Sequence, residues 1–171
     1  FGSSIANIGD LNGDDIIDSK TPAIKQMIDV YNKYEDMVVG TVEVDKKLVD
    51  QYGVVDPKEK NFKGKVFELK GIVEKPARAK APSNYASIGR FIFNPEIFEE
   101  LAKLKPGKGG EIWVSDAVSN IFKKRAVYAR NLDGTYYDCG NKLEYIKAVV
   151  NFSLKHPDLK SGVKKHLKSV C

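Results

Sequence analysis

The sequence GIVEKP, residues 71–76, ends a hydrophobic run with an acid, a base and a proline. Its two β-branched residues favour extended backbone, and Pro76 cannot donate to a strand ladder, so we expect a strand that stops here. On a regular strand Glu74 and Lys75 would point to opposite faces, whereas a twist at the proline would turn both into one cleft. The hexapeptide alone is more typical of a solvated strand end, so its surroundings decide between the two interpretations.

The chain around this strand alternates between strand-like and helix-like segments. We expect further strands over residues 37–44, 54–55, 84–93 and 126–130. We expect helices over residues 21–34, 46–52, 96–104, 115–124 and 142–156. Such alternation predicts an α/β fold with a mixed, mainly parallel sheet flanked by helices. The dipeptide Asp133-Gly134 predicts a hairpin that adds an antiparallel strand to this sheet.

Composition indicates a globular protein without membrane or nucleic-acid partners. The 171 residues are 42% hydrophobic and 30% charged, which is enough for one buried core. No apolar run approaches the roughly 18 residues of a membrane span, and no signal peptide is visible. The two cysteines do not suggest a disulfide framework, so we expect a cytoplasmic protein. Much of the net charge of +5 comes from the end of the chain, which lacks interleaved aromatic residues and is more typical of a solvated helix end than of a nucleic-acid site.

The first eighteen residues differ in character from the rest of the chain. Their acidic and amide side chains follow the D-x-N-x-D pattern of a calcium loop, with Asp10, Asn12, Asp14 and Asp18 as the possible ligands. The run also resembles a single FG-GAP repeat of integrin-type propellers. An aspartate replaces the usual loop glycine, the bidentate glutamate is missing, and one repeat cannot bury a core alone. A calcium-binding interaction module is therefore the minor alternative for the whole chain.

Five short clusters place charge or glycine next to predicted strands. They are GDD (13–15), YGVV (52–55), EKP (74–76), GEI (110–112) and YDCG (137–140). In this order the chain resembles the bacterial UTP–glucose-1-phosphate uridylyltransferase family, the UDP-glucose pyrophosphorylases, from about Gly13 to Asp158. The resemblance is carried by GDDIIDSKTPAIKQMIDVY, QYGVVD, GIVEKP, APSNYASIGRFIFNPEIFEEL, KPGKGGEIWVSDAV and YYDCGNKLEYIKAVVNFSLKHPDL. One tetrapeptide is a weak signal, but six runs in order with matching spacing are specific.

This resemblance implies a fold and a reaction. The fold is that of the nucleotide-diphospho-sugar transferases, a Rossmann-like α/β fold, here in truncated form. In the implied reaction of carbohydrate metabolism, a phosphate oxygen of glucose 1-phosphate attacks the α-phosphorus of UTP, pyrophosphate leaves and UDP-glucose forms. Such chemistry depends mainly on positioning and charge neutralisation.

The resemblance assigns the metal-binding and catalytic positions. Asp14 and Asp138 match two acidic positions beside the phosphates, where they imply a Mg²⁺ ion held by carboxylate and phosphate oxygens. Taken without the resemblance, Asp14 is more typical of a turn and Asp138 of a cap or hairpin end. Lys75 matches the lysine that meets the sugar phosphate, so Lys75 and Asp14 are the implied catalytic residues.

The sugar side is assigned in the same way. Glu74 matches the acid that accepts hydrogen bonds from glucose hydroxyls. Gly53 matches a glycine that lets the sugar approach the backbone, although it also suits the end of a helix. Asn84 and Gly89 are expected to line the pocket, and the place of Gly89 inside its strand indicates either a bulge or a ligand close to the backbone. Glu111 either contacts the sugar or braces its loop.

The chain also departs from the family pattern. The glycine-rich loop that grips the nucleotide is absent, and residues 1–12 look foreign to the family. We therefore expect three segments: a leader (1–12), a partial nucleotidyltransferase domain (13–158) and a basic tail (159–171). Such a chain would bind UTP poorly and turn over slowly or not at all, and its open sheet edge predicts a homo-oligomer or marginal stability. A thymidylyltransferase acting on glucose 1-phosphate is the closest alternative, although YDCG and GGEIWVSDAV favour the uridylyl branch.

Overall fold

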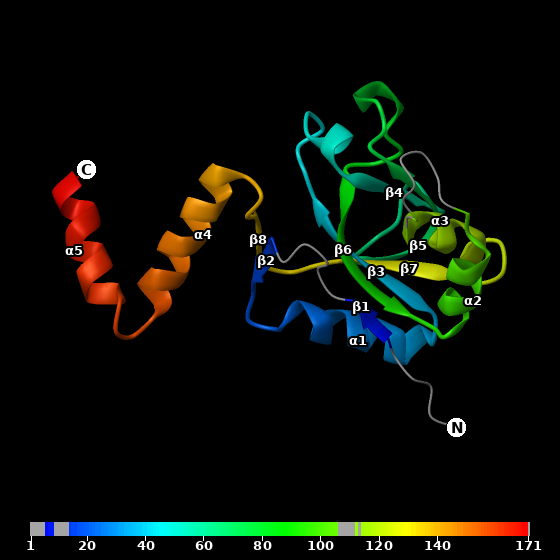
Figure 1. Ribbon diagram of the computed structural model, residues 1–171, viewed down its shortest axis with the longest axis horizontal. Coiled ribbons are helices and arrows are strands. Elements are labelled where there is room, and N and C mark those ends of the chain that lie inside the picture. Colours follow the sequence, from blue (N-terminus) through cyan, green and yellow to red (C-terminus); the bar gives the residue numbers. More distant parts are fainter. Residues whose placement is uncertain (1–5, 9–13, 106–111, 113, 171) are drawn as a thin grey trace. The chain divides into compact units, whose positions relative to one another are not determined.

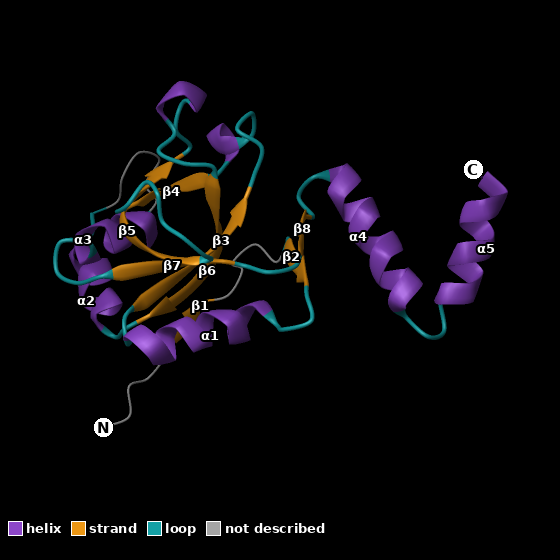
Figure 2. Ribbon diagram, turned by 180° about the vertical axis from the view of Figure 1, so that it is seen from behind, coloured by secondary structure: helices purple, strands orange, loops and turns teal. Residues whose placement is uncertain are grey.

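The computed structural model describes residues 6–8, 14–105, 112 and 114–170 (Figures 1 and 2). The chain forms two compact units, which differs from the single body expected over residues 13–158. The sheet unit comprises Phe1–Leu11 and Ser19–Asp133, and the helical unit comprises Asn12–Asp18 and Gly134–Cys171. Among the described helices, none is both long and apolar enough to cross a bilayer.

The sheet unit is built on a six-stranded sheet in the order β1-β6-β3-β7-β5-β4. Its strands are β1 (Ala6–Ile8), β3 (Met37–Glu43), β4 (Gly53–Pro57), β5 (Val66–Glu74), β6 (Tyr85–Phe93) and β7 (Val127–Asn131). A further pairing of Gly53 with Ser87 and of Val54 with Ala86 joins β4 to β6. The five strands from β3 to β7 therefore close into a ring, and β1 pairs with the last residues of β6.

The expected α/β fold and mixed sheet are confirmed, but the mainly parallel pairing was wrong. In the described sheet only β3 and β7 run parallel, and the other neighbours are antiparallel. The physical reason lies in the connections. Loops and single 3₁₀ turns, η1 (Val49–Gln51) and η2 (Arg78–Lys80), join β3, β4, β5 and β6 in sequence, whereas a parallel neighbour needs a longer crossover.

The hairpin predicted at Asp133-Gly134 was also wrong. Strand β7 lies between β3 and β5, whereas β8 (Thr135–Asp138) pairs with β2 (Asp15–Asp18) in a separate two-stranded sheet. Gln26 holds the backbone of Asp133: its Nε2 donates to Asp133 O at 3.0 Å, and Asp133 N donates to Gln26 Oε1 at 2.8 Å. Gly134 then adopts a φ of 130°, a conformation open to glycine, and the chain leaves the sheet.

Three helices accompany the sheet within the described residues. They are α1 (Ala23–Tyr34), α2 (Glu96–Lys103) and α3 (Val114–Ile121). Both views show α2 and α3 side by side and α1 running along the strands (Figures 1 and 2). The core between the strands and the α2–α3 pair includes Met37, Phe93, Ile97, Val118 and Ile121, each at most 1% exposed. Burying each such side chain contributes about 1.5–3 kcal/mol, so this layer fixes the strands that carry the site.

In the sheet unit, one local prediction is confirmed and another was wrong. The predicted helix at 46–52 is only the turn η1, and Gly53 begins β4 rather than ending a helix. The bulge predicted at Gly89 is confirmed. Val39 pairs with Phe91 and Thr41 with Ser87, so β6 carries extra residues opposite β3, and Gly89 has a φ of 67°.

The helical unit contains the β2–β8 pair with α4 (Lys142–Lys155) and α5 (Lys160–Val170). The Asn141 side chain caps α4, accepting hydrogen bonds from Leu143 N at 2.9 Å and Glu144 N at 3.3 Å. At the other end of α4, Lys155 forms an ion pair with Asp18 on β2. The predicted cap and long helix are confirmed, and most of the basic tail forms α5.

Candidate functional site

Gly53 and Glu74 meet where β4 begins and β5 ends. The two residues are partners in the antiparallel register of these strands. A Cβ atom added to Gly53 would lie 2.9 Å from Glu74 Oε2, closer than real Cβ contacts permit. The glycine therefore leaves the space that the Glu74 carboxylate occupies.

Lys75 follows directly and ends the strand in an unusual conformation. Its φ of 42° places it in the left-handed region, where residues other than glycine are uncommon. Its N–H donates to Tyr52 O at 3.0 Å, which ties the end of β5 to the residue before β4. The alternation of side chains between the two faces of the strand stops at Lys75, one residue before the proline. The side chains of Glu74 and Lys75 are both exposed. Strain of this kind costs about 1–3 kcal/mol and is concentrated at functional sites.

The other predicted pocket residues lie along β6. Asn84 immediately precedes this strand, and its Nδ2 donates to Glu43 Oε1 at 2.9 Å. Gly89 lies within the bulge. Between them Ser87 pairs with Gly53, so it is the β6 neighbour of the Gly53–Glu74 junction. Nothing in the sequence indicated Ser87, because a small polar residue in a strand carries no motif.

Asp14 and Asp138 come together in the helical unit. Cys139 N donates to Asp14 O at 2.7 Å, and Gly140 N donates to Asp138 Oδ1 at 3.1 Å. A Cβ atom added to Gly140 would lie 3.0 Å from Asp14 Oδ2 and 3.1 Å from Asp138 Oδ1. Both carboxylates therefore converge on the space beside this glycine.

This pair of carboxylates suits a hard cation. Its donors are all oxygen atoms, which Mg²⁺ prefers, and Mg²⁺ typically takes one or two carboxylates and completes its shell with water and substrate phosphates. Within the described ranges no group of three or more potential ligands gathers, so a cation here would depend on oxygens supplied by substrate and water.

Three predicted ligands lie outside the described residues: Glu111 on the sugar side, and Asp10 and Asn12 of the possible calcium loop. Asp18, from the same loop prediction, lies in β2, where its carboxylate accepts a hydrogen bond from Asn151 Nδ2 at 2.7 Å and pairs with Lys155. The hydrogen bond from Lys155 lowers the pKa of Asp18. Calcium binding by this run stays a prediction.

Comparison with known proteins places the chain in a family. Residues 3–153 match the model of a family described as "Nucleotidyl transferase". The match begins inside the segment 1–12, so the expectation that this whole leader is foreign to the family was wrong. The UTP–glucose-1-phosphate uridylyltransferases of Staphylococcus haemolyticus and Staphylococcus epidermidis are 42% and 41% identical to this chain over 94% of its length. The match covers 55% of each relative, so the chain spans about half the length of the curated relatives it matches.

Solved structures agree with this placement. A UTP-bound UDP-glucose pyrophosphorylase from Acinetobacter baumannii superposes with a TM-score of 0.81 at 31% identity, over 92% of this chain and 54% of that one. A UDP-glucose pyrophosphorylase complexed with UDP-glucose gives a TM-score of 0.75 at 39% identity, over 84% of this chain and 54% of that one. The nucleotide-diphospho-sugar transferase fold is thereby confirmed.

Proposed function

We propose, since this chain belongs to the nucleotidyl transferase family, that it carries the sugar-phosphate and metal-binding residues of a UTP–glucose-1-phosphate uridylyltransferase. The observation that carries the proposal is the junction of β4 and β5. There a bare glycine backbone, an acid and a base meet at paired strand ends. Two observations support UTP and glucose 1-phosphate as the substrates. Relatives of the chain are named as UTP–glucose-1-phosphate uridylyltransferases, and a similar solved structure is a UDP-glucose pyrophosphorylase complexed with UDP-glucose.

In this proposal, Lys75 offsets the repulsion between the two negatively charged substrates. A phosphate oxygen of glucose 1-phosphate attacks the α-phosphorus of UTP, one P–O bond forms, and the P–O bond to pyrophosphate breaks. Two anions must approach each other, and an ammonium group beside them offsets their repulsion. The strained backbone of Lys75, tied to Tyr52, fixes the base of this side chain, so little ordering is needed at the moment of reaction.

Glu74 and Asn84 orient the sugar. The Glu74 carboxylate, which fills the space over Gly53, accepts hydrogen bonds from sugar hydroxyls. Glu43 takes one N–H of the Asn84 amide, which leaves the second N–H and the carbonyl oxygen of that amide for a ligand. Glu43 therefore sets the orientation of Asn84 without contacting the sugar.

Asp14 and Asp138 would hold the Mg²⁺ ion. When bound, Mg²⁺ neutralises phosphate charge and aligns the phosphates. The absence of a side chain at Gly140 keeps the space between the two carboxylates free, and the Gly140 N–H holds one Asp138 oxygen in place.

A cytoplasmic homo-oligomer completes the proposal. The substrates are charged phosphorylated metabolites, which fits a cytoplasmic enzyme. Self-association is supported by apolar side chains on α4 that are at least 40% exposed, among them Tyr145, Val149 and Phe152. Their spacing places them on one helix face.

Turnover by the protein tests the proposal and its closest alternative. Purified enzyme is given glucose 1-phosphate with Mg²⁺ and either UTP or dTTP, and pyrophosphate release is measured. We expect kcat/KM with UTP to exceed that with dTTP by about tenfold or more, in line with one well-matched polar contact to the base. Faster turnover of dTTP would instead assign the chain to a thymidylyltransferase.

A further inference from the structure

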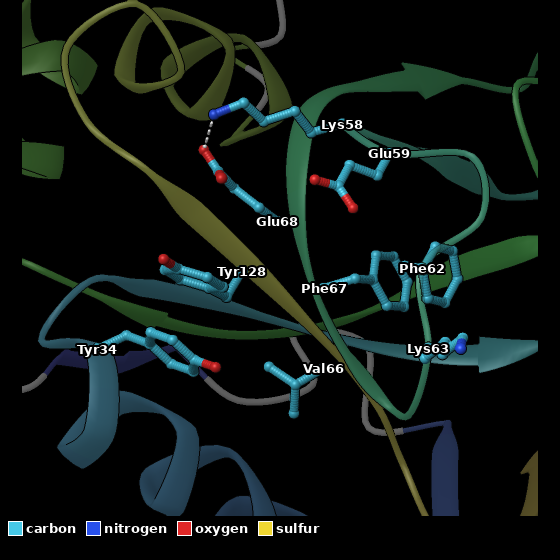
Figure 3. Close-up of a pocket in the computed structure, with 9 residues that line it drawn as sticks. All are labelled: Tyr34, Lys58, Glu59, Phe62, Lys63, Val66, Phe67, Glu68 and Tyr128. Carbon is cyan, nitrogen blue, oxygen red and sulfur yellow. Dashed lines mark hydrogen bonds and ion pairs between the residues drawn. The ribbon is translucent and has the colours of Figure 1, made fainter.

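A hollow lies at the opposite end of β5 from Glu74. It has a volume of about 250 Å³ and is lined by residues of α1, β5, β7 and the loop before β5 (Figure 3). Glu68, which lines it, precedes Glu74 by six residues, or about 20 Å of extended strand. The hollow is therefore separate from the Gly53–Glu74 junction.

Two stacked aromatic pairs form the walls of this hollow. The rings of Tyr34 and Tyr128 stack with centroids 4.1 Å apart, and those of Phe62 and Phe67 with centroids 3.8 Å apart. Figure 3 shows the two pairs on opposite sides, with Val66 between them. Aromatic faces carry partial negative charge and attract cations that approach within about 6 Å of the ring centre.

The charged residues of the hollow favour a cation over an anion. Glu59 and Glu68 lie along one side of it (Figure 3). Lys58 donates to Glu68 at 2.7 Å, and this hydrogen bond raises the pKa of the lysine. Glu59 makes no hydrogen bond to any of the residues that the structure describes. Lys63 lies beside Phe62, away from the two tyrosines (Figure 3).

The charges that act on the Tyr128 hydroxyl also favour a cation. Burial is the main cause that raises the pKa of this hydroxyl, followed by the negative charges of Glu68 and Asp36. The opposing effect of Lys58 is the smallest of the named causes. Two of the three charged residues that act on Tyr128 are therefore acidic.

The volume of the hollow limits the size of the ligand that it can bind. Sites for drug-sized molecules usually enclose roughly 300–1,000 Å³, and this hollow is smaller. It has no room for a whole nucleotide or a nucleotide sugar. It does have room for one flexible side chain with a charged end.

We propose that this hollow binds a single guanidinium or alkylammonium group carried on an apolar stem. The stem packs on Val66, and the cation lies between the Tyr128 ring and the Glu59 carboxylate. A basic protein side chain and a free alkyl guanidine share this chemistry, and they differ in what lies beyond the stem.

Titration of the 171-residue chain with matched probes tests the proposal. N-acetyl-arginine methylamide carries the guanidinium on its stem, and N-acetyl-citrulline methylamide is its uncharged isostere. NMR is followed at the backbone amides of Tyr34, Glu68 and Tyr128. We expect the arginine probe to shift these signals with a dissociation constant on the order of 1 mM, and the citrulline probe to bind at least about fivefold more weakly. Agmatine, a free alkyl guanidine, is titrated in parallel: tighter binding of agmatine indicates a small-molecule ligand, and tighter binding of the capped residue indicates a protein side chain.

Charge variants test whether the hollow attracts a positively charged group. Glu59→Gln is expected to weaken binding of the arginine probe about two- to fivefold, and Lys63→Gln to leave it equal or slightly tighter. Glu99→Gln, an exposed acid on α2, makes the same charge change elsewhere and should have no effect. Equal binding of the two probes, shifts confined to other residues, or tighter binding after Glu59→Gln would each overturn the proposal.

Discussion

Two glycines, at positions 53 and 140, each face carboxylates that a side chain would displace. In both places the residue matters for the space it leaves rather than for a backbone conformation, because neither has a positive φ. The neighbouring carboxylates, Glu74 beside one glycine and Asp14 and Asp138 beside the other, are the groups assigned to substrate and metal. Removing that space therefore tests function with little effect on the fold.

Gly53→Ala should separate binding from stability. The new Cβ atom would meet the mobile end of Glu74 at 2.9 Å, so the carboxylate can move aside and the free energy of unfolding should fall by less than about 1 kcal/mol. Binding of UDP-glucose should weaken by about tenfold, because Glu74 leaves its position. Calorimetric titration and thermal unfolding measure the two effects in the full protein. Gly71→Ala is the matched control, since nothing lies within 4 Å of its added Cβ; equal affinities for the two variants would contradict the role given to Gly53.

The sequence predicted the residues of the junction better than their geometry. Gly53, Glu74 and Lys75 were proposed as site residues because their motifs match those of the family, and the structure pairs Gly53 with Glu74. The left-handed backbone of Lys75 was not predicted, since lysine has no preference for that conformation and the strain is sustained by the hydrogen bond to Tyr52. The approach of Ser87 to Gly53 depends on how β4 and β6 close the sheet, which no local pattern encodes.

At the scale of elements, Glu100 joins α2 to the turn that follows α3. This buried carboxylate forms ion pairs with Lys124 at 2.5 Å and Lys103 at 2.9 Å. The hydrogen bond from Lys124, followed by that from Lys103, lowers the pKa of Glu100 below its ordinary 4.5. A lowered pKa in the folded state stabilises the protein above the unfolded value, and this stabilisation is lost as pH falls below 4.5 through the lowered value.

Glu100→Gln should remove that pH dependence. Below pH 4.5 the free energy of unfolding of the variant is expected to fall less steeply than that of the wild type, and at pH 7 the variant should be the less stable of the two. Urea unfolding at several pH values between about 3 and 7 measures the slopes. Glu99→Gln, on the exposed face of α2, serves as the control. Parallel curves for wild type and Glu100→Gln would rule out this role.

The cap of α4 gives a second test at this scale. Asn141→Ala removes an acceptor for the N–H groups of Leu143 and Glu144 and should reduce stability by about 1 kcal/mol. Asn141→Asp keeps the acceptor and should stay within a few tenths of a kcal/mol of the wild type. Chemical unfolding followed by circular dichroism distinguishes them; equal losses would show that the side chain does not cap the helix.

Elements were predicted best where the signal is local. The long helix after Asn141 and the strand from Val66 to Glu74 follow from capping and from β-branched residues. The prediction of a hairpin at Asp133-Gly134 was wrong because the backbone of Asp133 is held by Gln26, which lies more than a hundred residues away in sequence. The sequence signal for a turn was correct, but the partner of the following strand is a distant segment, β2.

For the whole molecule, the sequence predicted the α/β class and the family but neither the two units nor the strand directions. The split depends on contacts between segments far apart in the chain, such as Asp15–Asp18 with Thr135–Asp138. The Gly53–Glu74–Lys75 junction belongs to the sheet unit, and the Asp14–Asp138 pair belongs to the helical unit. Removing one of the proposed charges, on Lys75, Asp14 or Asp138, should lower turnover strongly without unfolding the chain.

The most direct test removes the Lys75 ammonium. In the full protein, Lys75→Ala should lower kcat/KM for UDP-glucose synthesis by about a hundredfold or more, because the repulsion between the two phosphates is no longer offset. Lys70→Ala is the control, since Lys70 lies on the same strand with an exposed side chain paired to Asp56 at 3.5 Å, and it should stay within about twofold of the wild type. A near-normal rate for Lys75→Ala, with UTP and glucose 1-phosphate as substrates, would contradict the proposed site.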